Sequence, residues 1–199
     1  MKVLILTEDK SVFDPESPAY KEILRCSERI DQLHVVVLNT KRDPHLYLQV
    51  SDKLFLYPTN SVLKIFSLWD TLKIVESQIF WKSQVATDLI CAKHSFLTNI
   101  AAYLLSRKYQ RNFIIDMHEN NFTQSRITDY VFPKASGIRV PSQFLGEIIS
   151  RGDPLLEKKI FVLPSLEAQK ETSRTEIGVE VDLRIKFPQF NIIILLVSE

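Results

Sequence analysis

Short apolar runs alternate along the chain with longer segments in which apolar residues recur every three or four positions. Each run is four or five residues long, which is typical of a buried strand. Seven such strands are predicted, at residues 3–7, 34–38, 53–57, 89–92, 113–117, 137–140 and 159–163. The periodic segments between them predict helices at residues 18–30, 62–82, 96–108 and 123–132, and one more after Ser142. Ser17 and Pro18 suit the start of the first helix, as cap and first helical residue.

Continuous apolar strands separated by helices predict the α/β class, with a parallel sheet that helices cover on both faces. In such sheets the functional loops gather at the carboxyl ends of the strands. We therefore expect functional residues in the loops 7–17, 92–95, 117–122 and 140–142, and at Pro164.

The chain changes character after residue 164. Residues 165–178 are polar and poor in aliphatic side chains, which predicts a linker. A short helix at 179–186 and a strand at 191–198 are predicted beyond it. Because a single strand after a linker is typical of the beginning of another domain, we expect three parts: a domain over 1–164, a linker over 165–178 and the start of a truncated second domain over 179–199.

Composition narrows the class of protein without identifying it. Of 199 residues, 45% are hydrophobic and 25% charged, which excludes disordered and coiled-coil chains. A net charge of +1 argues against a nucleic-acid partner. Cys26 and Cys91 lie in apolar segments and are expected to be buried free thiols, as in a reducing cytosol. The longest apolar run has six residues, against about 20 for a membrane helix, so we expect a soluble, cytoplasmic protein.

Several common catalytic motifs are absent. The chain has four glycines and none follows the first strand, which excludes a GxGxxG loop and a phosphate-binding P-loop. It has no GxSxG elbow of serine hydrolases. His118 and Glu119 begin like the zinc motif HExxH, but Phe122 occupies the place of the second histidine. A receiver domain needs a phosphate-accepting Asp where the third strand ends, and Tyr57 stands there instead.

The four histidines fall into two groups. His34 begins a strand and His45 lies in a polar loop, and we expect both to be solvated structural residues. His94 and His118 follow the fourth and fifth strands. Because ligands bind at that edge of an α/β sheet, these two are candidate functional residues.

Five segments together carry a resemblance to a known family. They are ATDLI at 86–90, FIIDMHEN at 113–120, ASGIRVPS at 135–142, KKIFVLP at 158–164 and DLRIKFPQF at 182–190. In this order and spacing, the chain resembles the N-terminal domain of family-4 glycosyltransferases, followed by the start of their second domain.

The resemblance implies a Rossmann-like acceptor domain that faces a donor domain across a cleft. It implies retaining transfer of a sugar from a nucleotide-sugar donor to a hydroxyl of a glycan or lipid acceptor. It implies no required metal and no cofactor, because the nucleotide sugar is a substrate. The acceptor domain alone is expected to be inactive, since the donor side of the cleft lies downstream or in a separate donor-domain partner.

The same resemblance implies catalytic roles at the end of the fifth strand. The imidazole of His118 would hydrogen-bond a sugar hydroxyl and stabilise charge as the glycosidic bond breaks. Asp116, two residues earlier, projects to the same side of the strand and would orient His118 or bond backbone amides.

Four more residues are candidates for substrate binding. Glu119 would act as a cap in its loop or contact acceptor hydroxyls, and His94 lies at the end of the fourth strand. The glycines that family members carry after the first strand are missing here, so Lys10 would supply charge for the donor phosphates. Ser17, at a helix N-terminus, would favour an anion or act only as the helix cap.

The alternative is a non-catalytic α/β module, split or degenerate, that binds a partner. Its motivation is the predicted strand at 191–197, which would expose apolar surface and a sheet edge. Such a chain would dimerise or dock on a separate donor domain. Nothing in the sequence indicates binding to a membrane surface.

Overall fold

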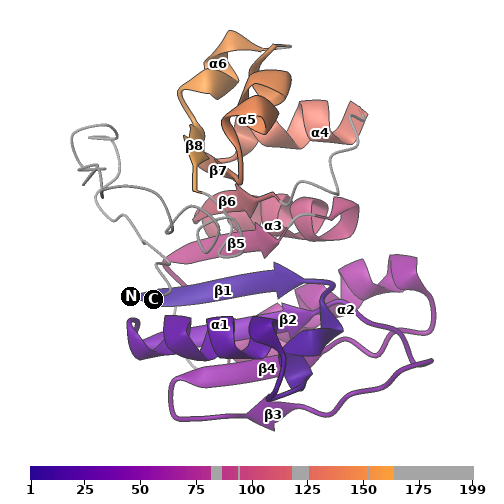
Figure 1. Cartoon of the computed structure of the whole chain (residues 1–199). Coiled ribbons are helices and arrows are strands. Elements are labelled where there is room, and N and C mark those ends of the chain that lie inside the picture. Colours follow the sequence, from indigo (N-terminus) through magenta and orange to yellow (C-terminus); the bar gives the residue numbers. More distant parts are fainter. Residues whose placement is uncertain (82–86, 94, 118–125, 152, 164–199) are drawn as a thin grey trace, which may run out of the picture. The chain divides into compact units, whose positions relative to one another are not determined.

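The computed structural model describes residues 1–81, 87–93, 95–117, 126–151 and 153–163. These residues belong to one compact unit, Met1–Leu163. The predicted linker at 165–178 and the helix and strand predicted beyond it lie outside the described residues. In the part that is described, eight strands form one sheet in the order β3-β4-β2-β1-β5-β6-β7-β8 (Figure 1).

Seven strands run parallel, and their bounds lie within two residues of the seven strands that the sequence predicts. They are β1 (Lys2–Thr7), β2 (Gln32–Val37), β4 (Leu54–Pro58), β5 (Leu89–Lys93), β6 (Asn112–Asp116), β7 (Gly137–Val140) and β8 (Ile160–Val162). The eighth, β3 (Leu48–Gln49), pairs antiparallel with β4 at the edge of the sheet. It was not predicted, because two exposed residues carry no alternating pattern. The α/β class with a parallel sheet is therefore confirmed.

The helices connect the strands. They are α1 (Pro18–Glu28), α2 (Ser67–Ile74), α3 (Phe96–Tyr109), α4 (Arg126–Val131), α5 (Gln143–Ser150) and α6 (Pro154–Glu157). Short 3-10 turns add η1 (Lys10–Phe13), η2 (Lys64–Phe66) and η5 (Phe132–Lys134). A π-helix, η3 (Val75–Trp81), continues α2. No helix in the described ranges is both long enough and apolar enough to cross a bilayer.

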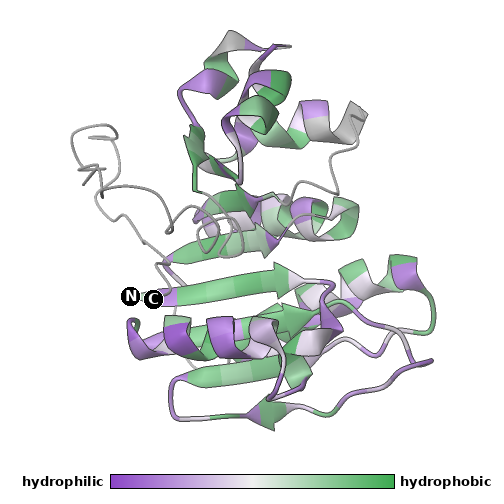
Figure 2. Cartoon of the chain, in the orientation of Figure 1, coloured by the Kyte–Doolittle hydropathy of each residue, from purple (hydrophilic) through white to green (hydrophobic). Residues whose placement is uncertain are grey.

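The two faces of the sheet are covered by different helices. Leu4 and Leu6 of β1 belong to the large apolar cluster that includes residues of α3. Their neighbours Val3 and Ile5 are buried on the opposite face, where α1 lies. Figure 2 shows the strands as an apolar layer, while α1 alternates between polar and apolar residues. The strands are therefore buried on both sides, which explains their continuous apolar runs.

Serine caps set the helix starts, as the sequence indicated. The Ser17 hydroxyl accepts a hydrogen bond from the Tyr20 amide at 3.0 Å, and Pro18 follows as the first residue of α1. Ser142 caps α5 in the same way. At α3, Ser95 and Thr98 form a reciprocal capping box. The starts of three helices that follow the carboxyl ends of strands are thus fixed by local hydrogen bonds.

The helix predicted over 62–82 is divided into three pieces, η2, α2 and η3. Val75 and Ile79 are fully buried, as expected. Ile65 and Trp69, expected on the same apolar face, are 65% and 64% exposed. The tighter 3-10 turn and the wider π turn have different numbers of residues per turn, so a single apolar face does not persist across the segment.

Candidate functional site at the carboxyl edge of the sheet

The strand order reverses at β1, which gives the sheet a topological switch point. The chain leaves β1 for β2 on one side, whereas β5 pairs with β1 on the other side. In open α/β sheets, ligands bind outside the carboxyl ends of the strands at this point. Here the carboxyl ends of β1 and β5 bring the loop at Glu8 next to the loop at Ser95.

A row of polar side chains crosses the sheet just below this edge. Lys93 of β5 lies opposite Asp116 of β6, and Asp116 lies opposite Arg139 of β7. Thr7 of β1 extends the row, because its neighbour Leu6 is paired with the residue before Lys93. Residues in register project to the same face of a sheet. The four side chains therefore line one face, the one that α1 covers.

Two ion pairs hold the charges of this row. The Lys93 ammonium lies 3.1 Å from a carboxylate oxygen of Glu22 on α1. The Arg139 guanidinium donates to both carboxylate oxygens of Asp116, at 3.1 and 3.2 Å. Burial favours the uncharged form of Lys93, but the carboxylates of Glu22 and Asp116 outweigh it and raise the pKa of Lys93. Each charged side chain of the row thus has an oppositely charged side chain beside it, and the partner of Lys93 comes from α1.

Glu8 connects three loops at the edge itself. One carboxylate oxygen accepts a hydrogen bond from the Ser95 hydroxyl at 2.8 Å. The other lies 2.6 Å from the Lys64 ammonium in η2. The next residue, Asp9, caps η1, and its own amide donates to the Thr7 hydroxyl at 3.0 Å. These contacts fix the loop after β1 without a glycine.

Three of the predicted site residues are described. Asp116 is buried and bonded to Arg139, as above. The Lys10 ammonium, in η1, lies 2.9 Å from a carboxylate oxygen of Asp43. The Ser17 hydroxyl donates to the Ser11 carbonyl at 2.5 Å besides capping α1. The structure brings Lys10 and Ser17 together around η1, whereas Asp116 lies two strands away on β6.

The other three predicted site residues, His94, His118 and Glu119, lie outside the described residues. The described range that contains β6 ends at Met117, whose amide donates a hydrogen bond to the Arg139 carbonyl at 3.0 Å. The roles of all six predicted residues stay predictions.

Four charged residues of this edge were missed by the sequence analysis, namely Glu8, Glu22, Lys93 and Arg139. Arg139 had a visible signal, since a single arginine stands inside an apolar strand. Its partner could have been inferred from parallel register, because Lys93 and Asp116 each end a strand and Arg139 lies one residue before the end of the next.

The cysteines contribute no nucleophile to this site. Both are free and buried, as predicted. Burial, and then the Glu22 carboxylate, raise the pKa of the Cys26 thiol to about 11. Burial also raises the pKa of Cys91. Both thiols are therefore protonated at neutral pH, and the thiolate is the reactive form. In the part of the chain that the structure describes, no group of His, Cys, Asp and Glu could hold a metal ion.

His34 corrects one prediction. It was expected to be solvated, but it is buried on β2 in register with Phe55 of β4. Its ring stacks on Phe55 with centroids 5.0 Å apart, and Nδ1 lies 3.2 Å from the Tyr57 hydroxyl. His34 is buried because β2 pairs with β4, and the residues next to His34 in the sequence do not reveal that pairing. His45 stacks on Phe13, with ring centroids 4.5 Å apart.

No protein-family model and no curated protein matches the sequence. Solved structures match the fold. Sucrose-phosphate synthase from Thermosynechococcus elongatus is 10% identical, with a TM-score of 0.59 over 87% of this chain and 98% of that one. UDP-GlcNAc 2-epimerase from Methanocaldococcus jannaschii, in complex with UDP-GlcNAc and UDP, is 16% identical, with a TM-score of 0.54 over 95% and 54%. The lipopolysaccharide outer core galactosyltransferase WaaB is 14% identical, with a TM-score of 0.53 over 83% and 46%.

The chain shares its Rossmann-like α/β fold with these structures. The chain spans about half the length of the epimerase and galactosyltransferase chains. At these identities the likeness concerns the fold.

Proposed function

We propose that this chain is the acceptor-side domain of a retaining glycosyltransferase related to family 4. The enzyme would transfer a sugar from a nucleotide-sugar donor to a hydroxyl of a glycan or lipid, in the cytoplasm and without a required metal. The five sequence segments support the family, and a galactosyltransferase and an enzyme in complex with UDP-GlcNAc are among the fold neighbours. The donor domain would begin after residue 178.

The observation that carries this proposal is the fixed end of β6. Asp116 is held by two hydrogen bonds from Arg139, and the Met117 amide is bonded to the Arg139 carbonyl. His118 follows directly in the sequence. A histidine that follows a hydrogen-bonded strand end at the carboxyl edge of the sheet suits the stabilisation of charge at a departing nucleotide.

Each predicted site residue has a role in this proposal. His118 acts beside the reacting sugar, and Asp116 positions it through the strand end. Glu119 contacts acceptor hydroxyls, and His94 contributes to substrate binding. Lys10 and Ser17 serve the donor phosphates, on the side of the edge where the loop after β1 lies.

The proposal is tested by a sugar-transfer assay on the protein encoded by the longest reading frame that contains this sequence. A panel of nucleotide sugars is combined with glycan and lipid acceptors, and NMR of the product reads the anomeric configuration. We expect transfer with retention, and at least 100-fold slower turnover for His118→Ala, because one stabilising group contributes on the order of 10²–10³ in rate. The 199 residues alone are expected to give no turnover.

The matched control is Asn112→Ala, at the exposed amino end of the same strand. It should leave turnover unchanged. Equal activity of the His118 and Asn112 variants would remove His118 from catalysis. If no nucleotide sugar supports transfer and a separate chain is bound tightly instead, the proposal fails in favour of the partner-binding module.

A further inference from the structure

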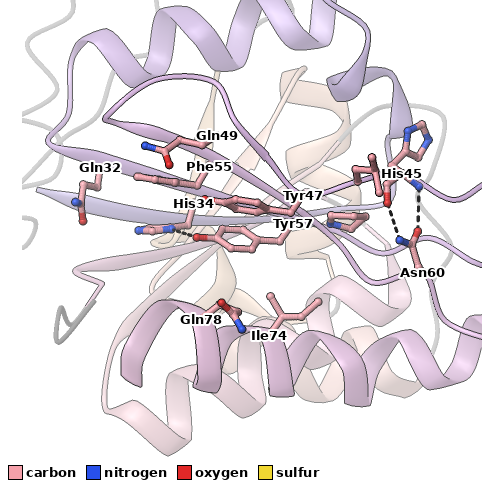
Figure 3. Close-up of a pocket in the computed structure, with 12 residues that line it drawn as sticks. Gln32, His34, His45, Tyr47, Gln49, Phe55, Tyr57, Asn60, Ile74 and Gln78 are labelled. Carbon is pink, nitrogen blue, oxygen red and sulfur yellow. Dashed lines mark hydrogen bonds between the residues drawn. The ribbon is translucent and has the colours of Figure 1, made fainter. Parts of the chain in front are cut away.

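A pocket of about 680 Å³ lies on the opposite face of the sheet from the polar row (Figure 3). Its floor is formed by β2 and β4, where His34 and Phe55 stand in register on that face. Figure 3 shows Ile74 and Gln78, at the junction of α2 and η3, pointing toward Tyr57 from the other side. The space is therefore a slot between the sheet and a helix, with a volume that suits a small molecule.

One wall of the slot is a set of aromatic rings packed against one another, with neighbouring planes inclined by 13° to 43°. The rings of His34 and Phe55 are inclined by 13°, with centroids 5.0 Å apart. The rings of His34 and Tyr57 are inclined by 28° at 5.9 Å. Tyr47, which is 53% exposed, lies 5.1 Å from Tyr57 at the mouth. The exposed Tyr47 ring is accessible to a further flat ring, which can stack on it.

Among its described residues, the lining holds no carboxylate, lysine or arginine that could pair with an ionised ligand. None of the twelve described residues that line the slot is Asp, Glu, Lys or Arg. Burial, and then the charge of Lys2, lower the pKa of His34 to about 4, so its imidazole is neutral at pH 7. Because burying an ionised group without a counter-charge is costly, the slot favours an uncharged ligand.

Two buried polar atoms of the lining lack a hydrogen-bond partner. They are the side-chain carbonyl oxygen of Gln32 and Nε2 of His45. A carboxylate oxygen of Asp43 lies 3.7 Å from His45 Nε2, which is within ion-pair range for a protonated imidazole but beyond hydrogen-bond distance. Figure 3 places Gln32 and His45 at opposite ends of the slot. A ligand with polar groups toward both ends would satisfy what the protein leaves open.

We propose that this slot binds an uncharged nucleoside, whose heteroaromatic base stacks on the exposed Tyr47 ring, beside the stacked rings of Phe55, His34 and Tyr57. Base edges carry donors and acceptors that match side-chain amides, and Gln32 and Gln78 supply such amides. The sugar hydroxyls extend the ligand toward the second unpartnered atom. The inference is independent of the proposed function, since the slot lies on the opposite face of the sheet from the polar row.

Saturation-transfer NMR of the full chain with adenosine, guanosine, cytidine and uridine tests this proposal. We expect saturable binding of at least one nucleoside. Tyr47→Ala should weaken it about tenfold or more, because a base-stacking ring contributes on that order. This variant alters an exposed side chain, so the fold is retained. Gln32→Met, which removes the unpartnered carbonyl at similar volume, should also weaken it.

The matched control is Tyr130→Ala, because Tyr130 is 56% exposed on α4 and is not among the lining residues. It should bind like the wild type. The matching 5′-monophosphate should bind no more tightly than its nucleoside. Lack of saturable nucleoside binding, equal affinities of the Tyr47 and Tyr130 variants, or a monophosphate preferred tenfold would each overturn the proposal. Binding of lactose in place of nucleosides would overturn it in favour of a carbohydrate pocket.

Discussion

Acidification tests how strongly the sheet holds His34 in its neutral form. Burial, and then the nearby Lys2 charge, lower the pKa of His34 from 6.5 to about 4. Between these two values the unfolded chain binds a proton that the folded chain does not bind. The free energy of unfolding should therefore fall as the pH drops from about 6.5 toward 4, and His34 should have no effect above that range.

The size of the effect follows from the difference between the two pKa values. One pKa unit corresponds to about 1.4 kcal/mol, so the shift from 6.5 to about 4 makes His34 responsible for a loss of about 3 kcal/mol. This is a large share of the 5–15 kcal/mol typical of a domain. The shift is consistent with the surroundings of the ring, which stacks on Phe55 and meets the Tyr57 hydroxyl.

Urea unfolding, followed by circular dichroism between pH 7 and pH 4, measures this loss in the wild type and in His34→Gln. The carboxylates contribute equally to both proteins, so the difference between the two pH profiles isolates the histidine. We expect the stability of the variant to decrease less steeply below pH 6.5, by up to about 3 kcal/mol at pH 4. Parallel profiles would refute the reasoning and show that His34 is solvated or protonated in the folded chain.

Two further predictions concern the carboxyl edge. Glu22→Gln leaves the buried Lys93 ammonium without the Glu22 carboxylate. We expect the free energy of unfolding to fall by about 2 kcal/mol, between the values for exposed and fully buried ion pairs. Urea unfolding measures this change, and a loss below about 0.5 kcal/mol would contradict a buried pair. Ser95→Ala removes the α3 capping box and the hydrogen bond to Glu8, and it should lower the thermal midpoint by an amount equivalent to about 1 kcal/mol. Ser142→Ala is its control and should cost less, since that cap makes one 3.4 Å bond.

Local patterns predicted most of the fold. The seven parallel strands are continuous apolar runs, and the caps at Ser17 and Ser142 depend only on residues three positions away. The prediction of one continuous helix over 62–82 was wrong. Apolar residues spaced three or four apart do not reveal that the winding changes from 3-10 to α to π. β3 failed because it is set by pairing with β4.

The candidate site was less predictable, because it depends on register between strands. The sequence placed Asp116 at a strand end, but its partner Arg139 is 23 positions away and is found only when β6 and β7 are aligned. The pair of Lys93 and Glu22 spans 71 positions. His34 was misplaced for the same reason, since the strand that buries it follows 20 residues later.

The π-helix η3 borders the slot, so the number of residues in η3 affects the shape of the slot. A π turn closes its hydrogen bonds over one residue more than an α turn, and such turns are rare and often lie at functional sites. Loss of one residue within Val75–Trp81 would let α2 continue as a regular α-helix and would turn the following side chains around its axis. Relatives of this protein that differ by one residue in this segment would therefore keep the sheet and the core but have a different slot. Comparing homologues by the length of this helix, rather than by residue identity, would separate those that retain it.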